Sequence, residues 1–159
     1  MSKIISTTLE NICLQEKGAI ISGPFGSNIS SKYFVKFGIP VIRGNNLSLS
    51  YDKFYDNDFV FVTKEKADEL KCYAKKNDLI FTAAGTLGQV GIIPTEASYE
   101  EYVISNKQIR ARIDTKKVDV LYFSESKIKF KKKEKTKRNK SQLIEIGSFL
   151  ILILCFGVI

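Results

Sequence analysis

The chain has 159 residues, of which 44% are hydrophobic and 26% charged, so it can form one domain of ordinary globular composition but hardly two. Its formal charge of +8 is concentrated at one end, because residues 1–126 carry 16 Lys and Arg against 15 Asp and Glu, whereas residues 127–159 carry 9 against 2. Histidine is absent and the three cysteines lie far apart, which excludes histidine-activated nucleophiles and argues against a zinc site or a disulfide framework.

The first half of the chain is predicted to combine short strands with two short helices. Thr8 is a suitable N-cap for a helix over residues 9–13, because its hydroxyl can accept a hydrogen bond from a free backbone N–H. Thr63 is placed in the same way before a helix over residues 64–72, where apolar positions recur at helical spacing. β-Branched and aromatic runs predict strands at residues 19–22, 38–44 and 59–62.

The second half, up to residue 113, is predicted to be mostly strand. Asn77 and Asp78 turn the chain into a strand over residues 79–82, and spaced glycines precede an apolar segment at 92–94. Residues 108–113 alternate polar and apolar, which predicts a half-buried strand with one apolar and one polar-basic face. These elements together predict an α+β fold: a mixed, curved β-sheet globule with a few short helices.

The last 37 residues differ in character from the rest. Residues 127–140 are dominated by lysine, and residues 149–159 are nearly all apolar. We therefore expect a domain at 1–122 and a tail at 123–159. The apolar run of 11 residues is short of the roughly 20 needed for a membrane-spanning helix. A frameshift near residue 123 is the favoured origin, since A/T-rich codons give such runs; a membrane anchor and a natural short form are the alternatives.

Motifs for catalysis and nucleotide binding are missing. GTLGQVG lacks the G-x-G-x-x-G spacing, and GPFGSN is not followed by Gly-Lys-Ser/Thr. The three prolines are isolated, so the Asn/Asp-Pro-Pro-aromatic motif of an amino-methyltransferase is absent. We therefore expect a non-catalytic protein with no cofactor, no metal and no small-molecule substrate of its own. The absence of a signal-peptide pattern at the N-terminus predicts a cytoplasmic protein.

Five ordered blocks of the sequence carry a resemblance to a known family. They are GPFGSN (23–28), GIPVIRGNN (38–46), DFVFVTKEKADELK (58–71), NDLIFTAAGTLGQVGIIP (77–94) and YVISNKQIRARID (102–114). In this order and spacing they resemble the target recognition domain of the specificity subunit of type I restriction-modification enzymes. The resemblance covers roughly residues 1–122.

The resemblance implies a DNA-reading role without chemistry. In that family each recognition domain reads one half of a split double-stranded target. Separate methylation subunits bind S-adenosylmethionine, and a separate restriction subunit uses ATP and Mg²⁺. This chain has one such domain where the family has two, and no long spacer helix is recognisable. We therefore expect a truncated or frameshifted specificity subunit, and a non-functional fragment is the alternative.

The candidate DNA-binding residues fall into four clusters that offer donors to bases or phosphates. They are Ser27, Asn28 and Lys32; Arg43, Asn45 and Asn46; Thr86 and Gln89; and Lys107, Gln108, Arg110 and Arg112.

Each cluster also has a structural interpretation. GPFGSN predicts a tight surface turn, with unusual backbone angles at Gly23 and Gly26. The paired asparagines suit a turn, and the arginines suit the solvated face of a strand. Aromatic residues at 51–59 are expected to pack in the core rather than stack on bases.

A second function class stays open at this point. The chain could be a protein- or membrane-interaction fragment with a C-terminal apolar anchor and no DNA binding. Salt-sensitive, sequence-dependent DNA binding would distinguish the two classes.

Overall fold

A computed structural model of the chain describes residues 4–48, 54–86, 89–117, 127–132 and 149–154. Its helices are α1 (Leu9–Ile12) and α2 (Lys64–Leu70), with 3-10 turns η1 (Gly26–Asn28), η2 (Ser31–Tyr33) and η3 (Gly44–Asn46). The strands are β1 (Ile4–Thr8), β2 (Ile20–Ser22), β3 (Ile39–Ile42), β4 (Val60–Val62), β5 (Tyr73–Ala74), β6 (Asp78–Thr82), β7 (Val90–Ile92), β8 (Tyr102–Ile104), β9 (Gln108–Arg112), β10 (Lys127–Lys132) and β11 (Phe149–Leu154). The predicted α+β class is confirmed.

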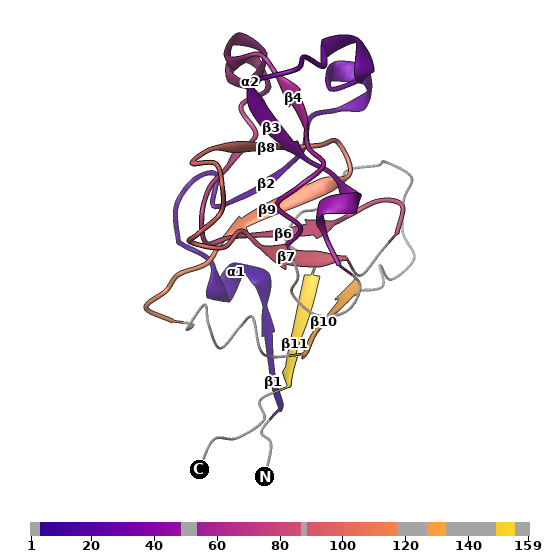
Figure 1. The fold of residues 1–159 in the computed structure, drawn as a ribbon. Coiled ribbons are helices and arrows are strands. Elements are labelled where there is room, and N and C mark those ends of the chain that lie inside the picture. Colours follow the sequence, from indigo (N-terminus) through magenta and orange to yellow (C-terminus); the bar gives the residue numbers. More distant parts are fainter. Residues whose placement is uncertain (1–3, 49–53, 87–88, 118–126, 133–148, 155–159) are drawn as a thin grey trace.

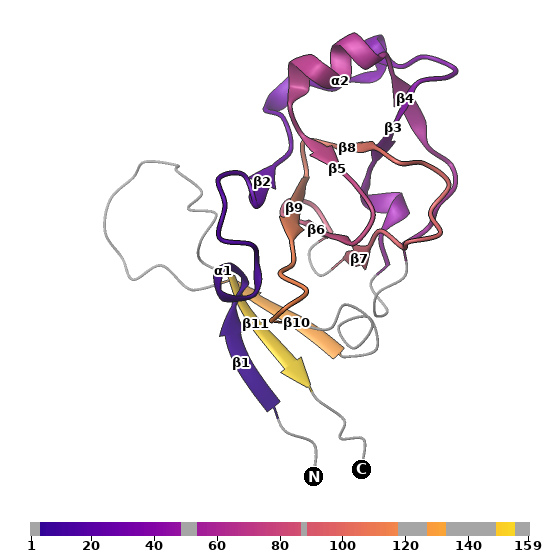
Figure 2. The same ribbon diagram turned by 90° about the vertical axis from the view of Figure 1, so that its left-hand side faces the viewer.

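The strands form three open sheets stacked along the long axis of the molecule (Figure 1). The upper sheet has the order β4-β3-β8-β5, the central sheet β2-β9-β6-β7, and the lower sheet β1-β11-β10. Pairing is antiparallel except between β3 and β8, which run parallel. Figure 2 shows the same order from the side, with α2 above the upper sheet and α1 between the central and lower sheets.

The central sheet is covered on both faces. Leu79 and Phe81 of β6 point into a core that includes Leu9 and Ile12 of α1, whereas Ile80 points into a core shared with the upper sheet. This follows from the strand period of two, which sends alternate side chains to opposite faces. Both faces of β6 and most of β9 are therefore buried.

One prediction about the central sheet is wrong. We expected the polar-basic face of residues 108–113 to be solvated, but Gln108 and Arg110 are 1% and 3% exposed. That face is directed toward the upper sheet, because Arg110 lies opposite Ile80 in the register. Alternation in the sequence shows which residues share a face, but it cannot show that both faces are covered.

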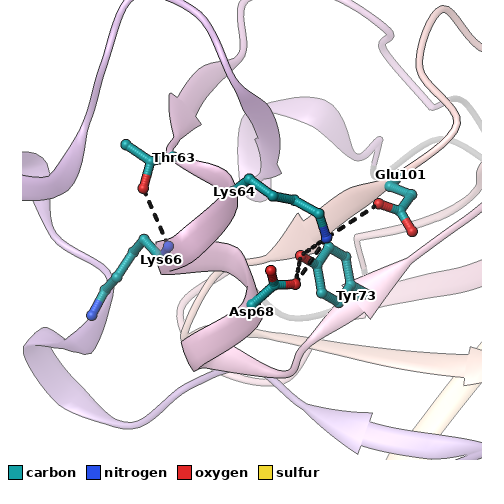
Figure 3. A network of polar contacts seen from close by, with 6 residues as sticks. All are labelled: Thr63, Lys64, Lys66, Asp68, Tyr73 and Glu101. Carbon is teal, nitrogen blue, oxygen red and sulfur yellow. Dashed lines mark hydrogen bonds and ion pairs between the residues drawn. The ribbon is translucent and has the colours of Figure 1, made fainter.

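Both predicted helix caps are confirmed. The hydroxyl of Thr8 accepts from the backbone N–H of Asn11 at 3.4 Å, and that of Thr63 accepts from the N–H of Lys66 at 3.2 Å. α2 ends before the predicted residue 72, since Lys71 adopts a left-handed φ of 53°. The helix is joined to β5 by a polar network (Figure 3), in which Lys64 Nζ lies 2.8 Å from both Asp68 Oδ1 and the Tyr73 hydroxyl.

Packing in the upper core is dominated by aromatic rings around Tyr102. The rings of Phe54, Phe59 and Tyr99 lie 5.6–5.8 Å from the Tyr102 ring, centroid to centroid. The predicted core role of Phe54 and Phe59 is thus confirmed, whereas Tyr55 is exposed; Tyr51 lies outside the described residues. The Tyr102 hydroxyl donates to Asp56 Oδ1 at 2.9 Å, and Asp56 also accepts from the N–H of Ser98 at 2.6 Å.

One segment of the predicted tail, β11, pairs with the N-terminal strand β1, and a second, β10, pairs with β11. β11 lies between β1 and β10, with Ile4 opposite Leu154 and Thr8 opposite Leu150. The predicted domain boundary at 122/123 itself lies outside the described residues. Within the part of the chain that the structure describes, no helix is long and apolar enough to cross a bilayer.

Replacing Tyr102 with Phe should lower the free energy of unfolding by about 1–3 kcal/mol, because the charged carboxylate of Asp56 loses the hydrogen bond that the Tyr102 hydroxyl donates to it. Burial opposes ionisation of Asp56, but its hydrogen bonds from Ser98 and Tyr102 outweigh this and hold its pKa below the ordinary value. A depressed carboxyl pKa stabilises the fold above the unfolded-state pKa, and this stabilisation is lost as pH falls through the folded-state pKa.

Urea denaturation at pH 7 and at pH 3 measures this effect. The loss of unfolding free energy caused by Tyr102→Phe should be smaller at pH 3 than at pH 7. The exposed control Tyr55→Phe should have the same unfolding free energy as the unmodified chain at both pH values. A deficit independent of pH would assign the loss to packing instead.

Candidate nucleic-acid interface

A groove lies where four strands of two sheets begin or end. β3 and β8 run parallel, so both end at the same edge of the upper sheet. β6 and β9 run antiparallel with Thr82 opposite Gln108, so the end of β6 meets the beginning of β9. The turns that follow β3, β6 and β8 therefore converge. They enclose an open cavity of about 350 Å³.

The floor of this groove is a continuous chain of hydrogen bonds. Ser105 Oγ donates to Gln108 Oε1, and Gln108 Nε2 lies 3.5 Å from Thr82 Oγ1. Thr82 Oγ1 donates to Gln89 Oε1 at 3.2 Å. Gln89 Nε2 then donates to the carbonyls of Gly44 and Leu47 at 2.9 and 3.3 Å. The chain ties the turn after β3 to the ends of β6, β8 and β9, and so fixes the floor.

The segments that border the groove contain no carboxylate. No Asp or Glu occurs at residues 17–51, 79–95 or 102–113, although the chain has 17 in all. Two cations, Arg43 and Lys107, line the groove together with hydroxyl, amide, small and a few apolar side chains. Although residues 1–126 are almost neutral in sum, this face is suited to an anionic ligand.

The first predicted cluster lies beside the groove rather than in it. Ser27, Asn28 and Lys32 are exposed but are not among the residues that line the cavity. Their loop is fixed to the rim, because Asn106 Nδ2 donates to the carbonyl of Gly26 at 3.1 Å.

The two glycines of GPFGSN have different roles. Gly26 has the expected left-handed φ, +55°. The predicted unusual angle at Gly23 is wrong, since its φ is not positive. Gly23 instead lies so close to the turn between β8 and β9 that a Cβ there would stand 1.8 Å from the Ser105 carbonyl oxygen.

The second cluster divides into surface and interior residues. Arg43 lines the groove, with Nη2 donating to the Asp58 carbonyl at 3.1 Å, and Asn45 is exposed. Asn46 is 0% exposed; its Oδ1 accepts from the N–H of Arg43, and its Nδ2 donates to the carbonyls of Tyr55 and Asn57. Its assignment to DNA contact is therefore corrected to a structural role.

The third cluster is likewise divided. Thr86 is exposed on the loop between β6 and β7 and lines the groove. Gln89 also lines it, but both ends of its amide are used in the floor network. Gln89 therefore positions the turn after β3 and is not free to read a base.

In the fourth cluster only Lys107 is fully on the surface. Gln108 and Arg110 are buried, and their assignment to DNA contact is corrected. Arg110 Nη2 donates to the Gly18 carbonyl at 2.8 Å, and its Nε lies 3.9 Å from Asp78 Oδ2. Arg112 is partly exposed and pairs with Asp78 and Glu16 at 3.4 and 3.8 Å. Burial raises the pKa of Asp78 and lowers that of Arg110, and their mutual attraction opposes both shifts.

Three groove residues with polar side chains were not predicted from the sequence. Thr82 lies at the end of β6, and Ser105 and Asn106 form the turn between β8 and β9. The Ser-Asn pair after the apolar run 102–104 is a turn signal that could have identified two of them. Thr82 carries no such signal, because its place depends on pairing with Gln108.

No metal or thiol chemistry is indicated in the described residues. They contain no group of three or more Cys, Asp and Glu placed to hold a metal ion. Burial raises the pKa of the Cys13 thiol to about 12 and that of Cys72 to about 11. Both thiols are therefore protonated at neutral pH and poor nucleophiles.

Two comparisons with known proteins gave no match. No family model matches the chain, and no curated protein matches its sequence significantly.

Replacing Gln89 with Glu should lower the free energy of unfolding by about 1–3 kcal/mol, because a carboxylate cannot donate to the Gly44 and Leu47 carbonyls. The two side chains have nearly the same shape, so the substitution tests the hydrogen bonds and not the packing. Thermal or urea unfolding at neutral pH measures the loss. The exposed neighbour Thr86→Ala should stay within about 0.5 kcal/mol of the unmodified chain. Equal stabilities of Gln89→Glu and Thr86→Ala would contradict the floor network.

Proposed function

We propose that this chain is a non-catalytic DNA-recognition module, the half-site reader of a type I restriction-modification system. The groove carries the proposal, since it combines two cations and several hydroxyl and amide groups with no carboxylate on any bordering segment. A phosphate backbone needs such cations and N–H donors, and base edges are read by side chains of these types. The turns that present them follow buried strands and are therefore held on a rigid support.

The resemblance in the sequence agrees with this location. Four of the five blocks, at 23–28, 38–46, 77–94 and 102–114, supply the turns beside or around the groove. The fifth, at 58–71, forms β4 and α2. Residues that the resemblance rests on are thus gathered at one face, although they lie far apart along the chain.

The proposed partners follow from the same family. The module would read a few base pairs of double-stranded DNA in the cytoplasm and act with separate methylation and restriction subunits. S-adenosylmethionine, ATP and Mg²⁺ would be bound by those subunits. Arg43, Asn45, Thr86 and Lys107 are the side chains that we assign to the DNA surface, with Ser27, Asn28 and Lys32 at its margin. Arg112 is assigned to the ion pairs with Asp78 and Glu16.

Replacing Lys107 with Ala should weaken binding to all duplexes alike and reduce the slope of log affinity against log salt by about 1, because one phosphate contact is lost. The measurement is a salt titration of the full chain with duplexes selected from a random-sequence pool. Lys75→Ala is the matched control, since Lys75 is exposed before the start of β6, at the opposite end of that strand from the groove. Failure to enrich any sequence from the pool would reject DNA recognition itself.

The purified chain should transfer no methyl group from labelled S-adenosylmethionine to DNA and hydrolyse no ATP. The reason is the lack of histidine, of a P-loop and of a methylation motif in the sequence. Incorporation of label into DNA, measured by scintillation, and phosphate release are the readouts. Turnover that co-purifies with the chain through successive columns would contradict the non-catalytic assignment.

A further inference from the structure

The loop beside the groove presents an aromatic ring to solvent. Phe25, in GPFGSN, is 89% exposed, the largest value among the exposed large hydrophobic side chains of the described residues. Burying a phenylalanine side chain is favourable by roughly 1.5–3 kcal/mol, but the fold leaves the Phe25 ring in water. A binding partner that covers the ring would gain this free energy.

The ring is carried by a fixed loop. The N–H of Gly23 donates to the Gln108 carbonyl at 2.9 Å, and the Phe25 carbonyl accepts from the N–H of Asn28 at 3.2 Å. Asn106 Nδ2 holds the carbonyl of Gly26, the next residue. Because the backbone is tied on both sides of Phe25, the ring is presented in a defined place.

That place is the rim of the groove. Asn106, which holds the loop, lines the groove beside Lys107. The segment 17–51 around Phe25 carries four Lys and Arg and no carboxylate. An exposed apolar ring on a segment with cations and short polar side chains but no carboxylate matches the side chains that architectural proteins insert between DNA base pairs. A protein-docking surface would be expected to have further apolar groups beside the ring, whereas Ser27 and Asn28 follow it.

We propose that Phe25 is a wedge that inserts at a base step of the DNA bound in the groove and partly unstacks it. The proposal rests on the DNA-recognition function and extends it, since it assigns deformation of the duplex to one residue. Specificity then comes partly from the ease with which the step at this position is unstacked, in addition to contacts made by the groove.

The test uses the full chain and a duplex selected from the random-sequence pool, with 2-aminopurine placed in turn at each step of the selected site. Binding of the unmodified chain should raise the fluorescence at one step, because the probe brightens when it is unstacked. Phe25→Ala should abolish the rise and weaken binding about tenfold, in the range found for loss of one base–aromatic contact. Phe25→Leu should retain part of both effects, since leucine also serves as a wedge.

Phe37→Ala is the matched control. Phe37 is 86% exposed and does not line the groove; it adjoins the start of β3, where Ile39 lies opposite Val62 of β4. It should change neither affinity nor fluorescence. All variants should melt at the temperature of the unmodified chain, since both rings are exposed.

The outcomes separate the two proposals. Sequence-selective binding in which Phe25→Ala matches the unmodified chain, or in which no step brightens, overturns the wedge and leaves DNA recognition standing. Unchanged DNA binding with lost capture of a methylation subunit overturns it in favour of a protein contact. No binding to any duplex of the pool overturns both.

Discussion

The hydrogen-bond chain across the groove floor is the constraint on which the rest of the candidate interface depends. It runs from Ser105 through Gln108, Thr82 and Gln89 to the carbonyl of Gly44, and so joins the ends of two sheets that share no strand pairing. It exists only because Thr82 lies opposite Gln108 in the β6–β9 register. A slip of one residue would turn both side chains to the other face, and the turn after β3 would lose its side-chain link to β6 and β9.

The same register explains how the charged side chains of the central sheet are paired. At the end of β6 away from the groove, Asp78 lies opposite Arg112 and close to Arg110. Two arginines that raise the basic count of the sequence are thus paired with Asp78, Arg110 in the interior and Arg112 partly exposed with Glu16 beside it. Removing the Asp78 carboxylate would leave the buried Arg110 without its counter-ion, an arrangement that costs about 3–5 kcal/mol. The cations available to a ligand are instead those on turns, Arg43 and Lys107, in a groove whose described lining includes no carboxylate.

Sequence reasoning succeeded where the signal was local. The caps at Thr8 and Thr63, and the apolar runs that became β3, β4 and β6, each carry their cause within a few residues. It failed where the cause was distant. β5 and β8 were missed; β5 has only two residues, and each of the two strands is held by pairing with a strand distant in the sequence. β1 was missed as well, since its partner β11 lies about 145 residues away along the chain. Asn46, Gln108 and Arg110 were assigned to the surface, because polar residues that satisfy one another inside a protein look like surface residues when read singly.

Some groove residues hold the backbone in place, whereas others are exposed on turns and are left to contact a ligand. The amides of Gln89 and Gln108 are used within the floor, so they hold the backbone in place and leave little for a ligand to read. The side chains left for recognition, Arg43, Asn45, Thr86 and Lys107, sit on turns whose course the floor already determines. Exchange of Asn45, Thr86 or Lys107 therefore alters the donors presented to a ligand in the groove without disturbing the sheets, and Arg43 has a further contact to the Asp58 carbonyl. A recognition module with a fixed floor and variable turns can acquire a new sequence preference while its fold stays the same.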